Sequence, residues 1–215
     1  QTLVYEKETL GLYLSGHPID RYSEELSTFV SCKLNDISSG KRRIAGLVSA
    51  IRTLNTRRGK MAIISLDDGS ARIEVVIYRE VFERHVEKLY VDNIVVMETK
   101  CGEDRYSGEF RIEATEVMSM DDARNNLAVE LSLLIKGSDT DAELLSELHK
   151  IIGKHTAGKI PVFVDYELNK ALARLRLPET CDVYLSDNLI DNLATSLGDD
   201  RVKLEYFNDS SSRKN

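Results

Sequence analysis

The alternation of apolar and polar residues predicts strands through the middle of the chain. From Arg43 onward, stretches rich in Ile, Val and Thr are broken by turns at Gly59, Gly69 and Gly108. Phe82, Val86 and Leu89 recur instead at helical spacing. The predicted strands cover residues 43–54, 61–67, 71–78, 93–102 and 109–119, and a helix covers residues 79–89 between the third and fourth strands.

This order of elements is that of an OB fold, a five-stranded Greek-key barrel. Barrels of this kind bind oligonucleotides or oligosaccharides on strands two and three and on two loops, L12 between strands one and two and L45 between strands four and five. Closure of the barrel also removes exposed sheet edges. We therefore assign residues 41–120 to an OB domain within a chain of the α+β class.

A second pattern occupies residues 121–207. After a short polar helix at Asp121 and Asp122, alternating strands are expected at 129–135, 160–166, 171–177 and 202–206. Ser138 or Asp139 is expected to cap a helix that ends at Gly153, and Ser186 to cap a last helix that ends before Gly198. The order βαββαβ predicts a small ferredoxin-like domain with a split βαβ sheet.

The two ends of the chain carry simpler patterns. Residues 1–40 predict a helical linker, with a helix near 6–14, a stop before Pro18, and a second helix capped by Asp20. Residues 208–215 are polar and lack apolar anchors, which predicts a disordered tail.

Composition places the chain among soluble globular proteins. It has 215 residues, of which 42% are apolar and 30% charged, and a formal net charge of −7. The uncharged apolar run at 44–51 is far shorter than the roughly 20 residues of a membrane helix, so we expect a cytoplasmic protein with no membrane partner. The scattered thiols of Cys32, Cys101 and Cys181 argue against a disulfide framework or a zinc site. Because Gln1 is not Met, we expect a fragment of a longer protein.

Basic residues concentrate in the predicted barrel. Residues 41–60 contain seven Lys or Arg and no acid, and residues 41–119 have a net charge of +1 against −8 for the rest. A patch of one sign in an otherwise acidic chain is typical of a site for a polyanion. The candidate nucleic-acid-binding residues are Arg52, Arg57, Arg58 and Lys60 near L12, Arg72 and Tyr78 on the third strand, and Arg105 and Tyr106 in L45.

Single-stranded nucleic acid fits these residue types. Cations follow the backbone while aromatic rings stack on bases, each stack contributing on the order of 1–3 kcal/mol. About three phosphate contacts would give a salt slope of roughly −2. Glu74, Glu103 and Asp104 dilute the patch, which predicts weak binding. The alternative is that these long side chains only solvate a hairpin.

Patterns for catalysis and cofactors are missing from the sequence. Asp67 and Asp68 precede Gly69 and Ser70, a string typical of a hairpin turn rather than of a metal site. The four histidines lie far apart and accompany no nucleophile motif, and no glycine-rich phosphate loop occurs. We expect no catalytic residue, metal or cofactor in this chain.

Two strings carry a family resemblance. EKETLGLYLSGHPID at residues 6–20 and AGLVSAIRTLNTRRGKMAIISLDDGSARIEVVIY at residues 45–78 resemble the C-terminal part of the alpha subunit of bacterial DNA polymerase III. The resemblance extends through residues 116–118 and, more loosely, through the second module.

The resemblance implies a non-catalytic tail of a DNA-directed DNA polymerase, a nucleotidyltransferase of the replisome. Its OB domain would contact single-stranded template, and its C-terminal domain would bind the tau subunit of the clamp loader within the holoenzyme. The linker at 1–40 would come from the polymerase body, which holds the catalytic carboxylates. The motif that binds the sliding clamp would lie upstream of Gln1.

Two other functions remain open at this point. Anticodon-binding OB modules share this barrel and a similar turn between strands two and three, so the domain could instead bind RNA. The barrel could also be a structural spacer that joins the polymerase body to a protein-binding module.

Overall fold

The chain folds into two compact units, Gln1–Met120 and Asp121–Asn215. The computed structural model describes residues 17–57, 59–104, 107–139, 141–168 and 171–207. The helix expected near 6–14 and the tail at 208–215 lie outside these described residues. Among the helices in the described ranges, none is long and apolar enough to cross a membrane.

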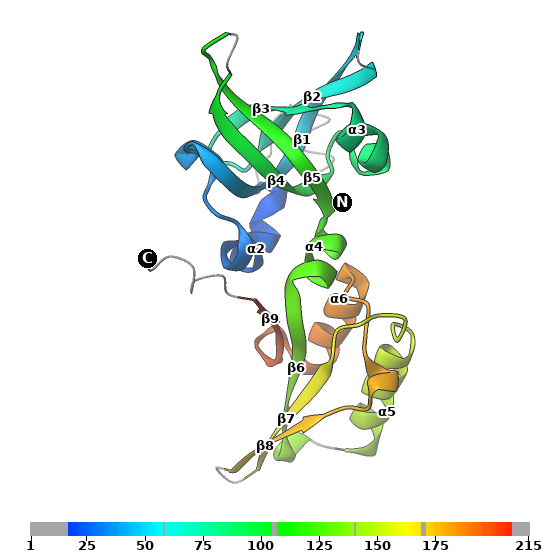
Figure 1. Cartoon of the computed structure of the whole chain (residues 1–215). Coiled ribbons are helices and arrows are strands. Elements are labelled where there is room, and N and C mark those ends of the chain that lie inside the picture. Colours follow the sequence, from blue (N-terminus) through cyan, green and yellow to red (C-terminus); the bar gives the residue numbers. More distant parts are fainter. Residues whose placement is uncertain (1–16, 58, 105–106, 140, 169–170, 208–215) are drawn as a thin grey trace, which may run out of the picture. The chain divides into compact units, whose positions relative to one another are not determined.

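The first unit is a closed five-stranded barrel in the order β1-β2-β3-β5-β4 (Figure 1). Neighbouring strands are antiparallel except β3 and β5, which run parallel where Val76 pairs with Glu113. This closure and order confirm the predicted OB fold. Its elements are β1 (Gly40–Thr56), β2 (Gly59–Asp67), β3 (Arg72–Ile77), α3 (Arg79–His85), η3 (Val86–Lys88), β4 (Ile94–Glu103) and β5 (Phe110–Ser119).

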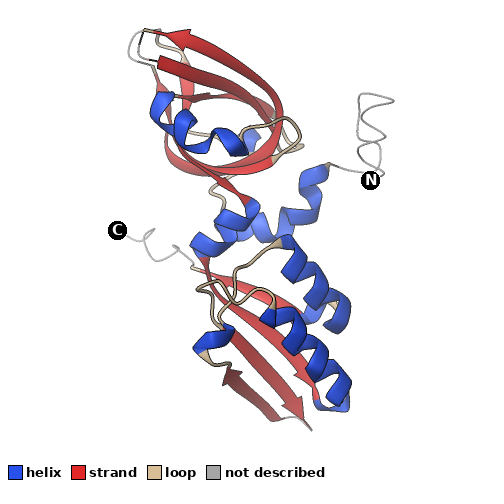
Figure 2. Cartoon of the chain, turned by 90° about the vertical axis from the view of Figure 1, so that its right-hand side faces the viewer, coloured by secondary structure: helices blue, strands red, loops and turns tan. Residues whose placement is uncertain are grey.

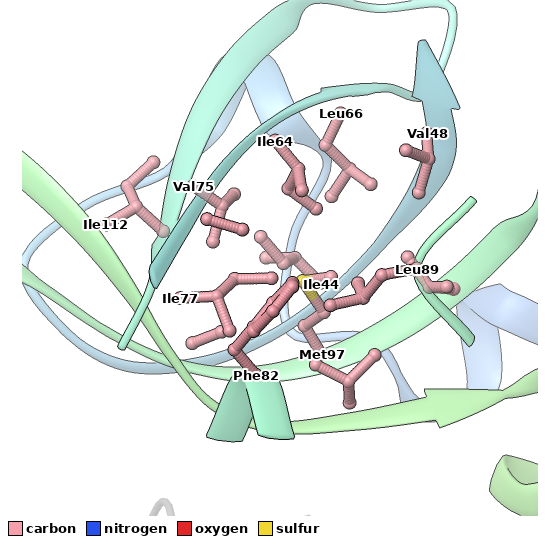
Figure 3. Packing of buried hydrophobic residues seen from close by; sticks show 14 of the residues in the cluster. Ile44, Val48, Ile64, Leu66, Val75, Ile77, Phe82, Leu89, Met97 and Ile112 are labelled. Carbon is pink, nitrogen blue, oxygen red and sulfur yellow. The ribbon is translucent and has the colours of Figure 1, made fainter. Parts of the chain in front are cut away.

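Strand alternation fills the barrel with apolar side chains. Ile64, Ile77 and Met97 are fully buried and converge inside the barrel (Figure 3). Phe82 reaches the same core from α3, which explains why a helix interrupts the strands. Register shifts near Val48 in β1 and near Glu98 in β4 mark bulges, which bend strands enough to close a small barrel.

Short helices precede the barrel: η1 (Pro18–Tyr22), α2 (Ser23–Phe29) and η2 (Leu34–Asp36). The expected cap at Asp20 is wrong. The side chain of His17 accepts the Ile19 backbone N–H at the start of η1, and the Asp20 carboxylate accepts the His17 N–H at 2.8 Å. Asp20 therefore completes a capping box one helix earlier, because the 3-10 turn begins at Pro18.

The second unit is a four-stranded sheet with helices, in the strand order β8-β7-β6-β9. Its elements are α4 (Met120–Leu127), β6 (Ala128–Lys136), η4 (Gly137–Asp139), α5 (Ala142–Gly153), β7 (Val162–Leu168), β8 (Ala171–Arg176), η5 (Glu179–Cys181), α6 (Asp187–Leu197), η6 (Asp199–Arg201) and β9 (Val202–Tyr206). The predicted order βαββαβ and the α+β class are confirmed.

The split sheet predicted for this unit is wrong. A split βαβ places another strand between its two parallel strands, whereas β6 and β7 pair directly, with Leu133 opposite Val164. Strand β8 then pairs with β7 as a hairpin at the sheet edge.

Helices α5 and α6 cover one face of this sheet (Figure 2). Leu148 and Ile152 of α5 and Leu189 and Leu193 of α6 pack in one core with β6 and β7. The cap of α5 is Asp141, not Ser138 or Asp139. Its carboxylate accepts the Leu144 N–H at 2.7 Å. Ser186 caps α6 as predicted, and the helices end at Gly153 and before Gly198.

Helix α4 is fastened within the second unit by buried polar contacts. The guanidinium of Arg124, 3% exposed, lies 2.6 Å from Asp187. The side-chain amide of Asn125 exchanges two hydrogen bonds with the backbone of Leu185, at 2.8 and 2.9 Å. A buried Arg that loses its carboxylate is costly, so α4 must be kept in any truncation that preserves this unit.

Candidate nucleic-acid interface

Hairpins β1–β2 and β4–β5 rise from the same end of the barrel (Figure 1). Two hollows, of about 870 and 330 Å³, are lined in part by residues of these hairpins. Tyr78, just after β3, and Glu113 of β5 line both of them. We call these two hollows together the cleft. Its position between L12 and L45 is where OB barrels bind their ligands.

The β1–β2 hairpin forms one wall of the cleft. Thr56 and Arg57 line the larger hollow with Met61 and Tyr78. The turn requires Gly59, because its φ of +114° is unfavourable for other residues and an added Cβ would clash with the side chain of Arg79. Arg79 in turn pairs with Glu83 at 2.9 Å. The tight turn places Arg57 at the mouth of the cleft, and Arg58 lies outside the described residues.

The β4–β5 hairpin forms the other wall. Asp104 organises its turn, since its carboxylate accepts the Ser107 N–H at 2.9 Å and its carbonyl accepts the Gly108 N–H at 2.8 Å. Arg111 of β5 lies 2.6 Å from the Asp104 carboxylate and donates a hydrogen bond to the Tyr78 hydroxyl at 3.3 Å. The predicted residues Arg105 and Tyr106 lie outside the described part of the chain.

An apolar strip crosses the outer surface of β1, β2 and β3. Arg52 pairs with Ile63, and Ile63 pairs with Val76, so the three side chains share one face. Two residues further along β3, Tyr78 points to the same side and is 39% exposed. Leu54, also 39% exposed, pairs with Met61 on this face. The strip therefore joins Arg52 to the cleft.

Two other predicted cations lie apart from the cleft. Lys60 lies on the same side of β2 as the buried Ala62. Its ammonium lies 5.6 Å from the ring centroid of Phe82. Arg72 starts β3, about 20 Å from Tyr78 at the usual strand rise, and pairs with Asp67 at 2.8 Å. The structure thus brings Arg57 and Tyr78 together, places Arg52 on the adjoining strip, and leaves Lys60 and Arg72 outside.

The Asp67 and Asp68 pair builds the turn between β2 and β3. One Asp68 oxygen accepts the N–H groups of Ser70 and Ala71, and the other accepts the Leu34 N–H at 2.9 Å. Although partial burial opposes ionisation, hydrogen bonds from Ser70, Leu34 and Ala71 hold the Asp68 pKa below its usual value. These carboxylates therefore fold the chain, as the turn interpretation predicted.

Among the described residues, no group of three or more His, Cys, Asp or Glu side chains could hold a metal ion. The three cysteines are free thiols, and burial raises the pKa of Cys32 above its usual value. Nothing in these side chains forms a nucleophile with an adjacent base.

Two cations of the smaller hollow were missed by the sequence analysis, Arg111 and Lys100. Arg111 alternates with the buried Ile112, which predicts an outward side chain. Its closeness to Tyr78 follows only from closure of the barrel, which lays β5 beside β3. The alternation therefore predicted that Arg111 faces outward, but only the strand order shows that it lies beside Tyr78.

The barrel and its cleft define an OB-fold domain of the nucleic-acid-binding class. The model of the OB-fold nucleic acid binding domain matches residues 43–120. Among solved structures, asparaginyl-tRNA synthetase from Pyrococcus horikoshii matches 41% of this chain and 22% of its own, at 17% identity and a TM-score of 0.33.

The second module and the chain as a whole match a replication protein. The model described as DNA polymerase III subunit alpha, C-terminal domain, matches residues 143–198. DNA polymerase III subunit alpha of Vibrio cholerae is 40% identical over 206 residues, and that of Escherichia coli is 36% identical over 207. Each match covers 94% of this chain and 18% of the relative's length. The chain is homologous to the C-terminal region of DNA polymerase III alpha subunits.

Proposed function

We propose that the barrel binds single-stranded DNA weakly as part of a replicative polymerase. The observation that carries this is the cleft itself, where Tyr78 is accessible between Arg57 on one wall and Arg111 on the other. An exposed ring flanked by cations suits a strand whose bases stack and whose phosphates need positive charge. Nearby Glu80, Glu83 and Glu113 weaken the field, which fits weak binding.

The test of the DNA site is a charge reversal on the β1–β2 hairpin. We expect the Arg57→Glu, Arg58→Glu variant to bind a labelled oligo-dT strand at least tenfold more weakly at low salt, because each lost phosphate contact removes counterion release. The matched control reverses Arg84, which is paired with Glu116 at 3.1 Å and lies outside the cleft lining. Unchanged affinity in the hairpin variant would exclude this wall as the site.

The same titration separates DNA from RNA. An anticodon-type module would prefer a matched oligo-U strand, because RNA-binding proteins use the 2′-hydroxyl. Equal or tighter binding to DNA supports the replication assignment. Binding to neither strand, with retained protein partners, would make the barrel a spacer.

We further propose that the second unit binds the tau subunit of the clamp loader. This unit carries 12 Lys or Arg against 17 Asp or Glu, so it does not favour a polyanion. Its edge strand β8 exposes Leu172 and Leu175 to 65% and 57%, surface that suits a protein partner.

A pull-down with tau tests this assignment. Deletion from residue 121, rather than from within α4, removes the whole unit and leaves no unpaired Arg124 behind. We expect this deletion to abolish tau capture while oligo-dT binding persists. Tau capture that survives the deletion would contradict the assignment.

We also propose that the catalytic carboxylates of the parent polymerase lie in the part of the protein upstream of this chain.

A further inference from the structure

Arg111 is held between an aromatic ring and a carboxylate at the wall of the cleft. Its Nη1 lies 2.6 Å from Oδ2 of Asp104 and 3.3 Å from the hydroxyl oxygen of Tyr78. The Arg111 side chain is 39% exposed, whereas that of Asp104 is only 15% exposed. All three residues line the smaller hollow. The guanidinium is therefore within reach of a ligand in the cleft, with an anion already beside it.

Arg57 on the opposite wall provides a contrast. Among the described residues, it has no carboxylate within ion-pair distance. A phosphate at Arg57 would only displace water and counterions, whereas a phosphate at Arg111 must also compete with Asp104. Both anions suit the same planar donor group, since arginine pairs with carboxylate and phosphate in the same bidentate geometry.

We propose that Arg111 is a phosphate-binding residue of the cleft and that Asp104 occupies it until a strand arrives. This deepens the proposed DNA site and rests on it. Binding exchanges one anion for another at Arg111, so this contact adds little affinity while Asp104 stays ionised. The displaced carboxylate also remains in the hollow, where it repels the strand. Asp104 is thus a built-in competitor that keeps strand binding weak.

The variant that tests this is Asp104→Asn in the full chain. Asparagine has the same shape and keeps an oxygen to accept the Ser107 N–H, so the turn retains its hydrogen bond. We expect labelled oligo-dT to bind this variant roughly three- to tenfold more tightly at low salt, because a close charge competitor is removed. The slope of log K against log salt should steepen by about 0.7, the value for one more phosphate contact on a single strand.

Two further variants separate this exchange from a general change in charge. Glu103→Gln removes the same charge from the neighbouring position of the same hollow, and we expect a change of less than about twofold. Arg111→Gln should weaken binding slightly. Adding Asp104→Asn to it should give a smaller gain than Asp104→Asn gives in the parent chain, because only the repulsion by the carboxylate is then relieved. Thermal unfolding midpoints of all variants check that the barrel is intact.

The outcomes distinguish the two proposals. An equal gain for Glu103→Gln, no gain for Asp104→Asn, or a gain that is undiminished without Arg111 would each overturn the exchange, even if the parent chain binds DNA. If neither the parent chain nor Asp104→Asn binds the strand at any salt concentration, the proposed DNA site itself fails. Binding that appears only in Asp104→Asn would support the competitor role directly.

Discussion

The barrel and the second unit bury the apolar faces of their sheets in different ways. The barrel closes on itself and leaves hairpins β1–β2 and β4–β5 projecting at one end, where Arg57 and Arg111 flank Tyr78. The second unit covers one sheet face with α5 and α6 and leaves β8 as an edge. Closure yields a walled cleft, whereas the open sheet yields an edge that another chain can contact.

Charge divides along the same line. Residues 41–119 have a net charge of +1, while residues 121–215 have a net charge of −5. By net charge, an anionic strand is therefore favoured by the barrel residues 41–119 and repelled by the second unit. A chain with a net charge of −7 thus has a barrel of net charge +1, as the proposed DNA site requires.

The largest expected effects on stability and binding come from substitutions that leave a cavity in one of the two cores. Ile64→Ala in the barrel and Leu189→Ala in the second unit each remove a fully buried side chain, so each should cost its own unit about 2–5 kcal/mol of unfolding free energy. Denaturant melts give these values. We expect Ile64→Ala to lose oligo-dT binding and keep tau capture, and Leu189→Ala to do the reverse. Strand binding lost only in Leu189→Ala would place the DNA site in the wrong unit.

Next in size is the loss of the exposed ring in the cleft. Tyr78→Ala removes a stacking surface, which should weaken oligo-dT binding by on the order of 1–3 kcal/mol. Tyr78→Phe keeps the ring and loses only the hydroxyl that Arg111 contacts, so it should bind nearly as well as the parent. Fluorescence anisotropy of a labelled strand measures both. Equal losses in the two variants would show that the hydroxyl matters and the ring does not.

The stability of the barrel should fall in acid because of the turn between β2 and β3. The Asp68 pKa is lowered below its ordinary 3.8, so its ionised form stabilises the fold above that pH and this stability is lost as the pH falls through the folded-state pKa. Asp68→Asn should cost about 1–2 kcal/mol at pH 7, and this cost should shrink as the pH falls below 3.8 and through the folded-state pKa. Denaturant melts across this range test it, and a cost independent of pH would refute the charge-based explanation.

The smallest effect is expected at Arg72. Although it belongs to the predicted patch, it pairs with Asp67 and lies far from Tyr78. Arg72→Gln should change oligo-dT affinity by less than about twofold and stability by about 0–1 kcal/mol, the usual contribution of an exposed ion pair. A loss comparable to that of the β1–β2 hairpin variant would extend the binding face to the far end of β3.

Alternation was enough to predict the barrel, because β2, β3 and the start of β5 bury alternate residues, although β1 buries five residues in succession at 44–48. It could not decide which strands pair in the second unit, where β6 and β7 meet directly instead of enclosing a third strand. Caps were also ambiguous by a few residues, since Ser138, Asp139 and Asp141 are all good capping types and only Asp141 has the right geometry.

The candidate site was only partly predictable for the same reason. Arg57 and Tyr78 could be placed because hairpin and strand positions follow from local sequence. Lys60 lies on the same side of β2 as the buried Ala62, so the alternation already indicated that it faces away from the outer surface. It was nevertheless assigned to the site because of its charge. Arg111 required the parallel pairing of β3 with β5, which no local pattern contains.

The most direct test of the central claim is the salt dependence of strand binding by the intact chain. We predict that a labelled oligo-dT strand binds with an affinity that falls as salt rises, with a slope of log K against log salt of roughly −2, as expected for about three phosphate contacts. A slope near zero, or no binding at low salt, would contradict a cationic cleft that receives single-stranded DNA.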